Sequence, residues 1–306
     1  MKIAITGTNG FVGKNLFEYL SNYYDNVYGL TRDIVDLNNY KNVKHFFDNH
    51  TFDIIIHCAS KGGSRKNNYD ADLTDVTKKN LDMFFHLENC LKSGMRMIHF
   101  GSGAEYDKSM SCENIAEEDF GRSIPKDGYG FSKYSISKYI EATNKPITCF
   151  RIFGLYGKYE DYTFKFISNA ILKNILDMPI TINQNVIFSF LYIKDLLKII
   201  HHFLKHLPAH KCYNLTPSEN VDLKTIAETI NLVSRNQSEI IILNSGLNTP
   251  YTGSCERLIK ELPNFNFTDT KVGIKDLYDY YAANYSRLDL DIIREDPYLK
   301  LCRNDN

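Results

Sequence analysis

Three residues of the chain have the types and spacing needed for acid–base chemistry on a carbonyl or hydroxyl group. Tyr129 and Lys133 form a Y-x-x-x-K pair, and residues i and i+4 lie on the same face of a helix. A phenol with a pKa near ~10 is a poor proton donor at neutral pH, but a neighbouring ammonium lowers that pKa by favouring phenolate. Ser102 follows the apolar run RMIHFG, at the edge of a parallel sheet where ligands bind. Its hydroxyl can orient a carbonyl or steady an alkoxide, so these three residues are the predicted catalytic group.

The N-terminal segment TGTNGFVG predicts a dinucleotide site. It has the pattern G-x-x-G-x-x-G, directly after the apolar run KIAIT and at the start of a predicted helix over 11–22. Glycines permit a sharp turn and a close approach to pyrophosphate, and the helix N-terminus supplies N–H groups and positive potential. The residues of this turn expected to contact the cofactor are Gly7, Asn9, Gly10, Phe11, Val12 and Gly13.

The end of the second predicted strand, 26–30, favours NADP(H) over NAD(H). An acid at this place would bind the ribose 2′-hydroxyl of NAD, whereas an arginine accommodates the 2′-phosphate of NADP. The chain has Thr31 and Arg32, followed by Asp33, and the forked guanidinium suits a phosphate. The alternative is that Arg32 is a solvated loop charge and Asp33 binds the ribose of NAD(H). The other predicted cofactor contacts are Asp36 and Leu37 near the adenine, Cys58, Ala59 and Ser60 along the ribose and pyrophosphate, and Ile152, Tyr129 and Lys133.

Alternating apolar and amphipathic segments must position these residues. The alternation is typical of a parallel sheet with helices on both faces. No linker rich in proline or glycine follows, so we expect a second lobe woven from separate insertions, with a loosely packed tail after Ser286. The expected strands are 2–6, 26–30, 52–57, 96–101, 147–152 and 187–193, and the expected helices are 11–22, 43–49, 72–93, 129–143, 195–206, 221–233 and 274–285.

Composition excludes several classes of protein. A net charge of −1 over 306 residues provides no basic field for nucleic acid. No apolar stretch approaches the ~20 residues of a membrane span, and no leader precedes the first strand, so we expect a cytoplasmic protein without a membrane partner. The seven cysteines show no C-x-x-C spacing, and His201-His202 lack a third ligand, so we expect no metal. His57 ends a core strand and is expected to be structural.

The chain resembles the extended short-chain dehydrogenase/reductases, the epimerase/dehydratase superfamily that acts on nucleotide sugars. The resemblance covers about residues 1–285 and lies in TGTNGFVG, IIHCAS, HFGSGAEY, YGFSK, RIFGLYG, FLYIKDL and YNLTPSENVDLKTIAETI. It implies an α/β fold: a Rossmann-like doubly wound parallel sheet over 1–157 with 186–214, and a smaller α/β C-terminal substrate lobe over 158–185 with 215–306. It also implies the Ser102, Tyr129 and Lys133 triad and a homodimer formed by the helices near 72–92 and 129–143.

Details within this resemblance separate the reactions. Dehydratases carry Thr-Asp-Glu where this chain has Ser102-Gly103-Ala104, so dehydration is not expected; Glu105 lies one position off that pattern. The segments LTRDIVDL and HCASKGGSRKN are similar to GDP-fucose synthase and its relatives, which reduce 4-keto sugars with NADPH. Those enzymes use a cysteine where Ala104 stands and a histidine in the loop equivalent to 158–163, both absent here, so reduction without 3,5-epimerisation is favoured.

The resemblance also bears on the substrate's phosphates. Many relatives place an arginine where this chain has Phe188. Lys158, Lys165 and Lys173 are candidate replacements, although lysines on helix surfaces are more often simply solvated.

The expected function is NADPH-dependent reduction of a 4-keto nucleotide sugar in surface polysaccharide biosynthesis. One alternative is an NAD-dependent nucleotide-sugar 4-epimerase or 4-dehydrogenase on the same scaffold. A remote alternative is a non-catalytic dinucleotide-sensing protein, whose usual mark, a lost Tyr or Lys, is absent at Tyr129 and Lys133.

Overall fold

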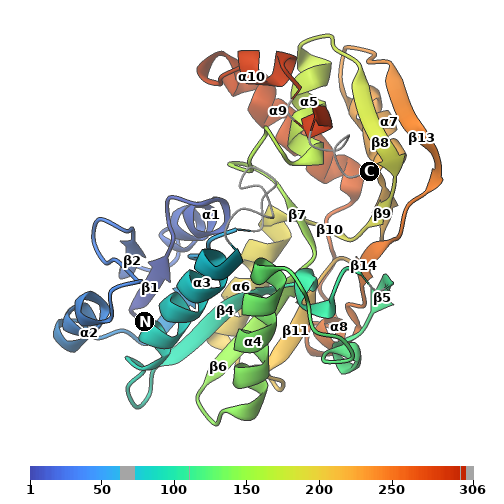
Figure 1. Cartoon of the computed structure of the whole chain (residues 1–306). Helices are drawn as coiled ribbons and strands as arrows, with labels where there is room; N and C mark the ends of the chain where they lie inside the picture. The colour runs from blue at the N-terminus through green and yellow to red at the C-terminus, as the bar shows by residue number, and fades with distance from the viewer. Residues whose placement is uncertain (63–72, 110, 297, 301–306) are drawn as a thin grey trace.

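The core of the protein is a six-stranded parallel sheet (Figure 1). The computed structural model describes residues 1–62, 73–109, 111–296 and 298–300. The strand order β11-β6-β4-β3-β1-β2 reverses direction between β1 and β3, which is the switch point where such sheets bind ligands. The α/β Rossmann-like prediction is therefore confirmed. The strands are β1 (Ile3–Thr6), β2 (Val27–Leu30), β3 (Ile54–His57), β4 (Arg96–Ser102), β6 (Ile147–Ile152) and β11 (Cys212–Leu215).

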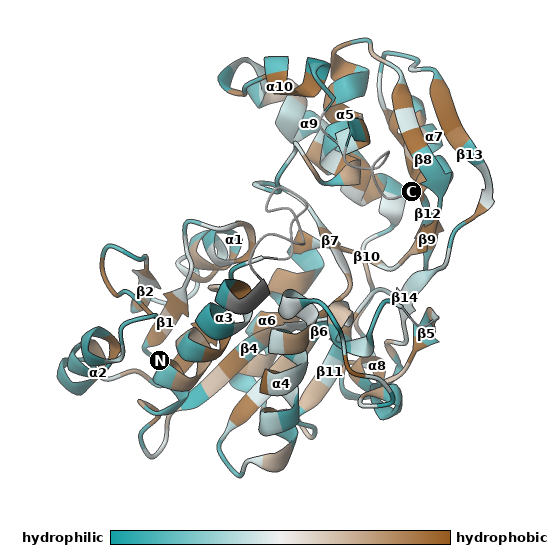
Figure 2. Cartoon of the chain, viewed as in Figure 1, coloured by the Kyte–Doolittle hydropathy of each residue, from teal (hydrophilic) through white to brown (hydrophobic). Residues whose placement is uncertain are grey.

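Helices cover both faces of this sheet because its strands are apolar on both sides. Ile3 and Ile5 of β1 pack into one core with α1 and α6. Ala4 between them points to the opposite core, under α2, α3 and α4. Apolar residues accordingly run along the strands and on the covering helix faces (Figure 2). The helices are α1 (Phe11–Leu20), α2 (Tyr40–Asn49), α3 (Leu73–Glu88), α4 (Gly128–Ala142) and α6 (Ile193–Lys205).

A second lobe lies beyond the carboxyl edge of the sheet (Figure 1). Its helices pack against one another and on a two-stranded parallel sheet of β8 and β13. Among the described residues, no helix is long and apolar enough to cross a membrane. The lobe contains α5 (Phe166–Ile175), β8 (Ile180–Asn185), α7 (Leu223–Val233), β13 (Ile240–Leu247), α9 (Thr270–Asn284) and α10 (Asp291–Arg294), whereas α8 (Glu256–Glu261) packs on β11 of the main sheet (Figure 1).

Two small sheets join the lobe to the main sheet. In one, β7 pairs with β10; in the other, the order is β12-β9-β14-β5. The second sheet draws its strands from four separate stretches of the chain. The strands are β5 (Cys112–Ile115), β7 (Gly154–Tyr156), β9 (Ile187–Phe188), β10 (Phe190–Tyr192), β12 (Val221–Asp222) and β14 (Tyr251–Gly253).

Three expectations about the second half of the chain were wrong. The single strand expected over 187–193 is two strands in different sheets, divided at Ser189, whose buried hydroxyl donates to Asn220 at 2.6 Å. The helix expected over 221–233 begins two residues later, because residues 221 and 222 pair with β9. The described part of the tail after Ser286 packs on the lobe, where Ile293 is fully buried.

A buried ion pair lies beneath the end of β4. Glu105 Oε2 accepts from Arg151 Nε at 2.8 Å, and both side chains are fully buried. The second partner of Arg151 is Glu141 on α4, at 3.1 Å. Burial opposes the charge of Arg151, but Glu105 holds the pKa of the guanidinium above its ordinary value. Because Arg151 lies on β6, the pair ties β6 to the turn that follows Ser102.

We expect Glu105→Gln to lower the free energy of unfolding by about 3 kcal/mol, since losing one partner of a buried ion pair costs about 3–5 kcal/mol and Glu141 remains. Urea unfolding followed by circular dichroism would measure this. The control is Lys44→Gln, which removes the exposed pair with Asp48 on α2 and should leave the midpoint unchanged. Equal midpoints for the two variants would contradict a structural role of the buried pair.

Candidate active site

The glycine turn after β1 has the shape of a pyrophosphate cradle. Gly7 has φ +68°, and a Cβ there would lie 2.8 Å from the backbone of Ala59. A Cβ on Gly13 would lie 2.4 Å from the carbonyl oxygen of Gly7. The helix α1 has Gly10 as its N-cap, without a side-chain hydrogen bond to the cap, so its first N–H groups and positive end suit a diphosphate. The residues present therefore fit a dinucleotide.

Thr6 fixes the neighbouring strand ends. Its Oγ1 accepts from the N–H groups of Cys58 and Ala59, each at 3.1 Å, and lies 2.9 Å from His57 Nδ1. Burial, with help from the Lys133 cation, lowers the pKa of His57 to about 3, so the imidazole is neutral and accepts from Thr6. His57 thus has the structural role expected of it.

Asn80 of α3 holds the loop after β3 against the catalytic helix. It accepts from Lys61 N at 2.8 Å and donates to Lys61 O at 2.9 Å and to Ser132 of α4 at 3.0 Å. A Cβ on Gly62 would lie 3.3 Å from the ring of Tyr129, so this loop packs beside the phenol. The end of the HCASKGGSRKN motif, residues 63–67, lies outside the described residues.

The residues predicted for the adenosine end follow β2. The Arg32 side chain is 81% exposed, with Asp36 3.9 Å away. Leu37 is buried, and its carbonyl accepts from His86 at 2.8 Å. The carbonyl of Thr31 accepts a hydrogen bond from Val35 N at 3.0 Å, which closes this turn. Arg32 therefore extends into solvent, with an exposed ion pair to Asp36.

Ser102 is the last residue of β4. Its backbone N–H donates to Glu105 Oε1 at 2.8 Å, and its Oγ accepts from Ala104 N at 3.1 Å. Ile152 of β6 lies beside it in register. Glu105, one position off the dehydratase pattern, points down into the ion pair with Arg151 and does not serve as an acid in the site.

Tyr129 and Lys133 lie on the first turns of α4, as the helical spacing predicts. The helix begins where Asp127 accepts from Gly130 N at 2.8 Å. Lys133 is buried, its Nζ donates to Phe100 O at 2.7 Å and lies 5.9 Å from the centre of the Tyr129 ring. Burial lowers the pKa of Lys133, and the negative charge of Glu105 opposes that shift. The Lys133 ammonium therefore lies near the Tyr129 ring.

The sheet that joins the lobe to the main sheet contributes aromatic side chains, of which sequence reasoning missed Tyr251. Tyr251 of β14 lies with its hydroxyl 2.5 Å from where a Cβ on Gly103 would be, and its ring is 5.2 Å from that of Phe153. Phe188 stands where the family resemblance places an arginine. The centre of its ring lies 6.0 Å from that of Tyr251 and 5.0 Å from that of Phe190. No sequence motif marks Tyr251; only its pairing in the β12-β9-β14-β5 sheet brings it here.

The lysines considered for the substrate's phosphates have other contacts. Lys158 pairs with Glu18 at 2.9 Å. Lys173 is not a solvated surface lysine: it is buried in the lobe and donates to Asp296 at 2.8 Å.

Comparison with known proteins identifies the family. Residues 3–216 match the model of the NAD dependent epimerase/dehydratase family. The chain belongs to this family. The predictions of an extended short-chain dehydrogenase/reductase and of an NAD(P)-dependent enzyme are thereby confirmed.

Individual members of the epimerase/dehydratase family are similar over most of the chain. The ADP-L-glycero-D-manno-heptose-6-epimerase of Brachyspira hyodysenteriae is 23% identical, over 85% of this chain and 90% of that protein. The GDP-L-colitose synthase of Yersinia pseudotuberculosis is 25% identical, over 67% and 73%. A crystal structure of a GDP-L-fucose synthetase from Naegleria fowleri bound to NADP has the same fold, with a TM-score of 0.78, 16% identity and 93% of each chain covered.

We expect Gly7→Ala to weaken NAD(P)H binding more than about tenfold, because a left-handed backbone costs an L-residue about 1–2 kcal/mol and the new methyl group also meets Ala59. Fluorescence titration of NADPH and NADH would measure the affinity. The matched control is Gly94→Ala, which has φ +84° but open space around the Cβ and should bind both cofactors normally. If Gly7→Ala binds as Gly94→Ala does, the turn is not the cofactor cradle.

Proposed function

We propose that this enzyme reduces the keto group of a 4-keto nucleotide sugar, with NADPH as the reductant. The proposal rests chiefly on Tyr129 and Lys133 in the first turns of α4, with the buried Lys133 Nζ 5.9 Å from the centre of the phenol ring, and on Ser102 at the carboxyl end of β4. The glycine turn of β1 opens onto the same edge, at the switch point of the strand order. A carbonyl placed between the two hydroxyls would have two donors at its oxygen.

Each side chain has a defined task in this reaction. NADPH, when bound, supplies the hydride that reduces the C4 carbon of the sugar. Ser102 donates to the keto oxygen and orients it, and Tyr129 transfers its phenolic proton to the same oxygen as negative charge develops there. Lys133 favours the phenolate that remains. Tyr129 then regains its proton from solvent, so the step yields an alcohol and consumes one proton.

Simple reduction fits the pocket better than combined epimerisation and reduction. Ala104 and the loop over 158–163 provide neither a thiol nor an imidazole, and Glu105 is engaged by Arg151. A 4-keto substrate agrees with the names of two Campylobacter jejuni enzymes of similar fold, a GDP-6-OMe-4-keto-L-xylo-heptose reductase and a GDP-mannoheptose C4 reductase. We place the reaction in the cytoplasm, in the supply of activated sugars for a surface polysaccharide.

A second candidate is an NAD-dependent 4-epimerase or 4-dehydrogenase. The observation in its favour is Asp33, which is exposed directly after Arg32 and could bind the ribose of NAD instead.

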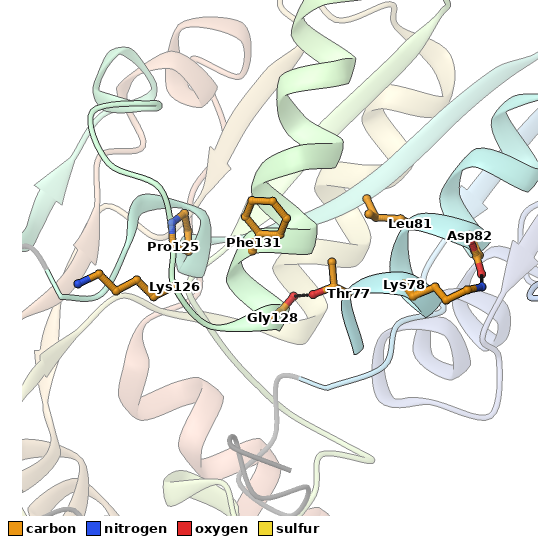
Figure 3. A pocket seen from close by; sticks show the side chains of 8 residues that line it. All are labelled: Thr77, Lys78, Leu81, Asp82, Pro125, Lys126, Gly128 and Phe131. Atoms are coloured by element: carbon orange, nitrogen blue, oxygen red, sulfur yellow. Dashed lines mark hydrogen bonds and ion pairs between the residues drawn. The ribbon is translucent and has the colours of Figure 1, made fainter. Parts of the chain in front are cut away.

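We further propose a homodimer through α3 and α4. Their outer face carries a groove of about 540 Å³ in which Leu81, Pro125 and Phe131 lie together (Figure 3). Phe131 is 40% exposed although it is fully apolar. Thr77 donates to Gly128 O at 2.9 Å and holds the two elements in place. An apolar groove of this kind suits burial against a second copy.

The proposed function is tested with NADPH and a panel of 4-keto sugars linked to GDP, dTDP, ADP and UDP, followed by the loss of NADPH absorbance. We expect one member to be reduced, and Tyr129→Phe to lower kcat by at least about a hundredfold because the proton donor is lost. The affinity for NADPH should be unchanged. Wild-type activity in Tyr129→Phe, or a protein that releases stoichiometric NAD(H) on denaturation, would contradict the proposal.

The cofactor preference is tested at Arg32. We expect Arg32→Ala to weaken NADPH binding by about tenfold or more and NADH binding little, because a charged hydrogen bond to the 2′-phosphate contributes about 1.5–3 kcal/mol. Asp33→Asn is the matched control and should weaken neither cofactor. An unchanged NADPH/NADH ratio in Arg32→Ala would make the arginine a bystander, and weakened NADH binding in Asp33→Asn would favour the NAD-dependent alternative.

A further inference from the structure

A second tyrosine reaches the catalytic serine from the opposite lobe. Tyr251 lies on β14, far in sequence from Ser102, and its hydroxyl lies beside the turn that directly follows Ser102. Its hydroxyl occupies the space beside Gly103, 2.5 Å from where a Cβ would be. Only glycine at 103 leaves room for this phenol, so the turn after β4 and the lobe are fitted to each other here.

The Tyr251 ring is held firmly. Its backbone pairs with Cys112 of β5 on one side and with Phe188 of β9 on the other. Its ring packs at 5.2 Å on Phe153, and the Lys108 ammonium lies 4.7 Å from the ring centre. A partly buried ring with neighbours on several sides loses little additional freedom when its hydroxyl forms a hydrogen bond.

Counting protons determines the direction of the hydrogen bond during reduction. The Ser102 hydroxyl has one hydrogen and two lone pairs, and one lone pair already accepts from Ala104 N at 3.1 Å. A keto oxygen can only accept. When Ser102 donates to the substrate, a hydrogen bond between the two hydroxyls must therefore run from Tyr251 to the remaining lone pair of Ser102.

Tyr251 stays protonated under all ordinary conditions. Burial of its hydroxyl raises the pKa well above the usual value for tyrosine, Cys112 and Tyr129 add to the shift, and the Ser102 side chain opposes it without reversing it. It is thus a permanent donor, whereas the task of Tyr129 requires that it release its proton. Two phenols in one site serve different purposes because their surroundings differ.

We propose that Tyr251 is a positioning residue: it donates a hydrogen bond to Ser102 and directs the serine proton toward the keto oxygen of the substrate. The inference rests on the proposed function, because the acceptor-only keto group sets the direction. It also means that the lobe, which is expected to hold the nucleotide sugar, takes part in arranging the proton donors.

The experiment is a double-mutant cycle with Tyr251→Phe, Ser102→Ala and the double variant in the full-length enzyme with NADPH. The substrate is the 4-keto sugar of the panel that the wild type reduces best. We expect Tyr251→Phe to lower kcat about tenfold, Ser102→Ala about a hundredfold, and the double variant no more than Ser102→Ala. KM should stay within about threefold in Tyr251→Phe, since only the reacting oxygen is affected.

A matched control separates positioning from stability. Tyr213→Phe removes another buried hydroxyl, which bonds to Glu261 away from the site, and should leave kcat unchanged at a comparable melting temperature. Wild-type kcat in Tyr251→Phe would overturn the proposal. So would additive losses in the double variant, because the tyrosine would then act independently of Ser102.

A measurement without substrate keeps this inference distinct from the proposed function. 3-Fluorotyrosine placed at position 251 gives a ¹⁹F resonance that should move when Ser102→Ala removes the partner hydroxyl, whereas the same label at 213 should not. If no keto sugar of the panel is reduced, the proposed function fails, and the fluorine shift alone decides whether Tyr251 and Ser102 are bonded. An unmoved resonance at 251 would refute that bond.

Discussion

The fully buried pair of Glu105 and Arg151 is the interaction on which the active site depends. One carboxylate serves three neighbours: it accepts from the backbone of Ser102, it neutralises Arg151, and its charge supports the cation of Lys133. Without it, the end of β4 would lose its hydrogen bond and two buried cations would lose an opposing charge. Burying such a pair is costly, and this one lies next to Ser102, which we propose as the catalytic serine.

The candidate site combines two kinds of element. The predicted cofactor and catalytic residues lie at the ends of β1, β3 and β4 and on α4, where the strands leave the two large cores. The far wall, with Phe153, Phe188 and Tyr251, comes from short strands that belong to both lobes. Aromatic side chains stand where relatives hold a phosphate with arginine.

Much of the first half of the fold follows from sequence, because each strand is a short apolar run ended by glycine or a polar turn. The glycine turn and the Y-x-x-x-K helix are local patterns, so they could be placed without tertiary information. Tyr251 could not, since its role arises from strand pairing across more than a hundred residues. The division of residues 187–192 into two strands at Ser189 could not be predicted either, because a continuous apolar run carries no signal for which sheet each part will join. The contact of Glu105 with Arg151 is equally non-local, and a buried acid next to a motif looks like a shifted catalytic residue.

The interleaving of the small four-stranded sheet limits how substrate choice can change in this enzyme. Strands β5, β9, β12 and β14 come from four places in the chain, and each is hydrogen-bonded to a strand from another. A chimera that exchanges one contiguous block with a relative would bring new strands against old partners. New specificities should therefore arise more readily by point substitutions at Phe153, Phe188 and Tyr251 than by recombination. Laboratory evolution of substrate choice would do well to follow the same route.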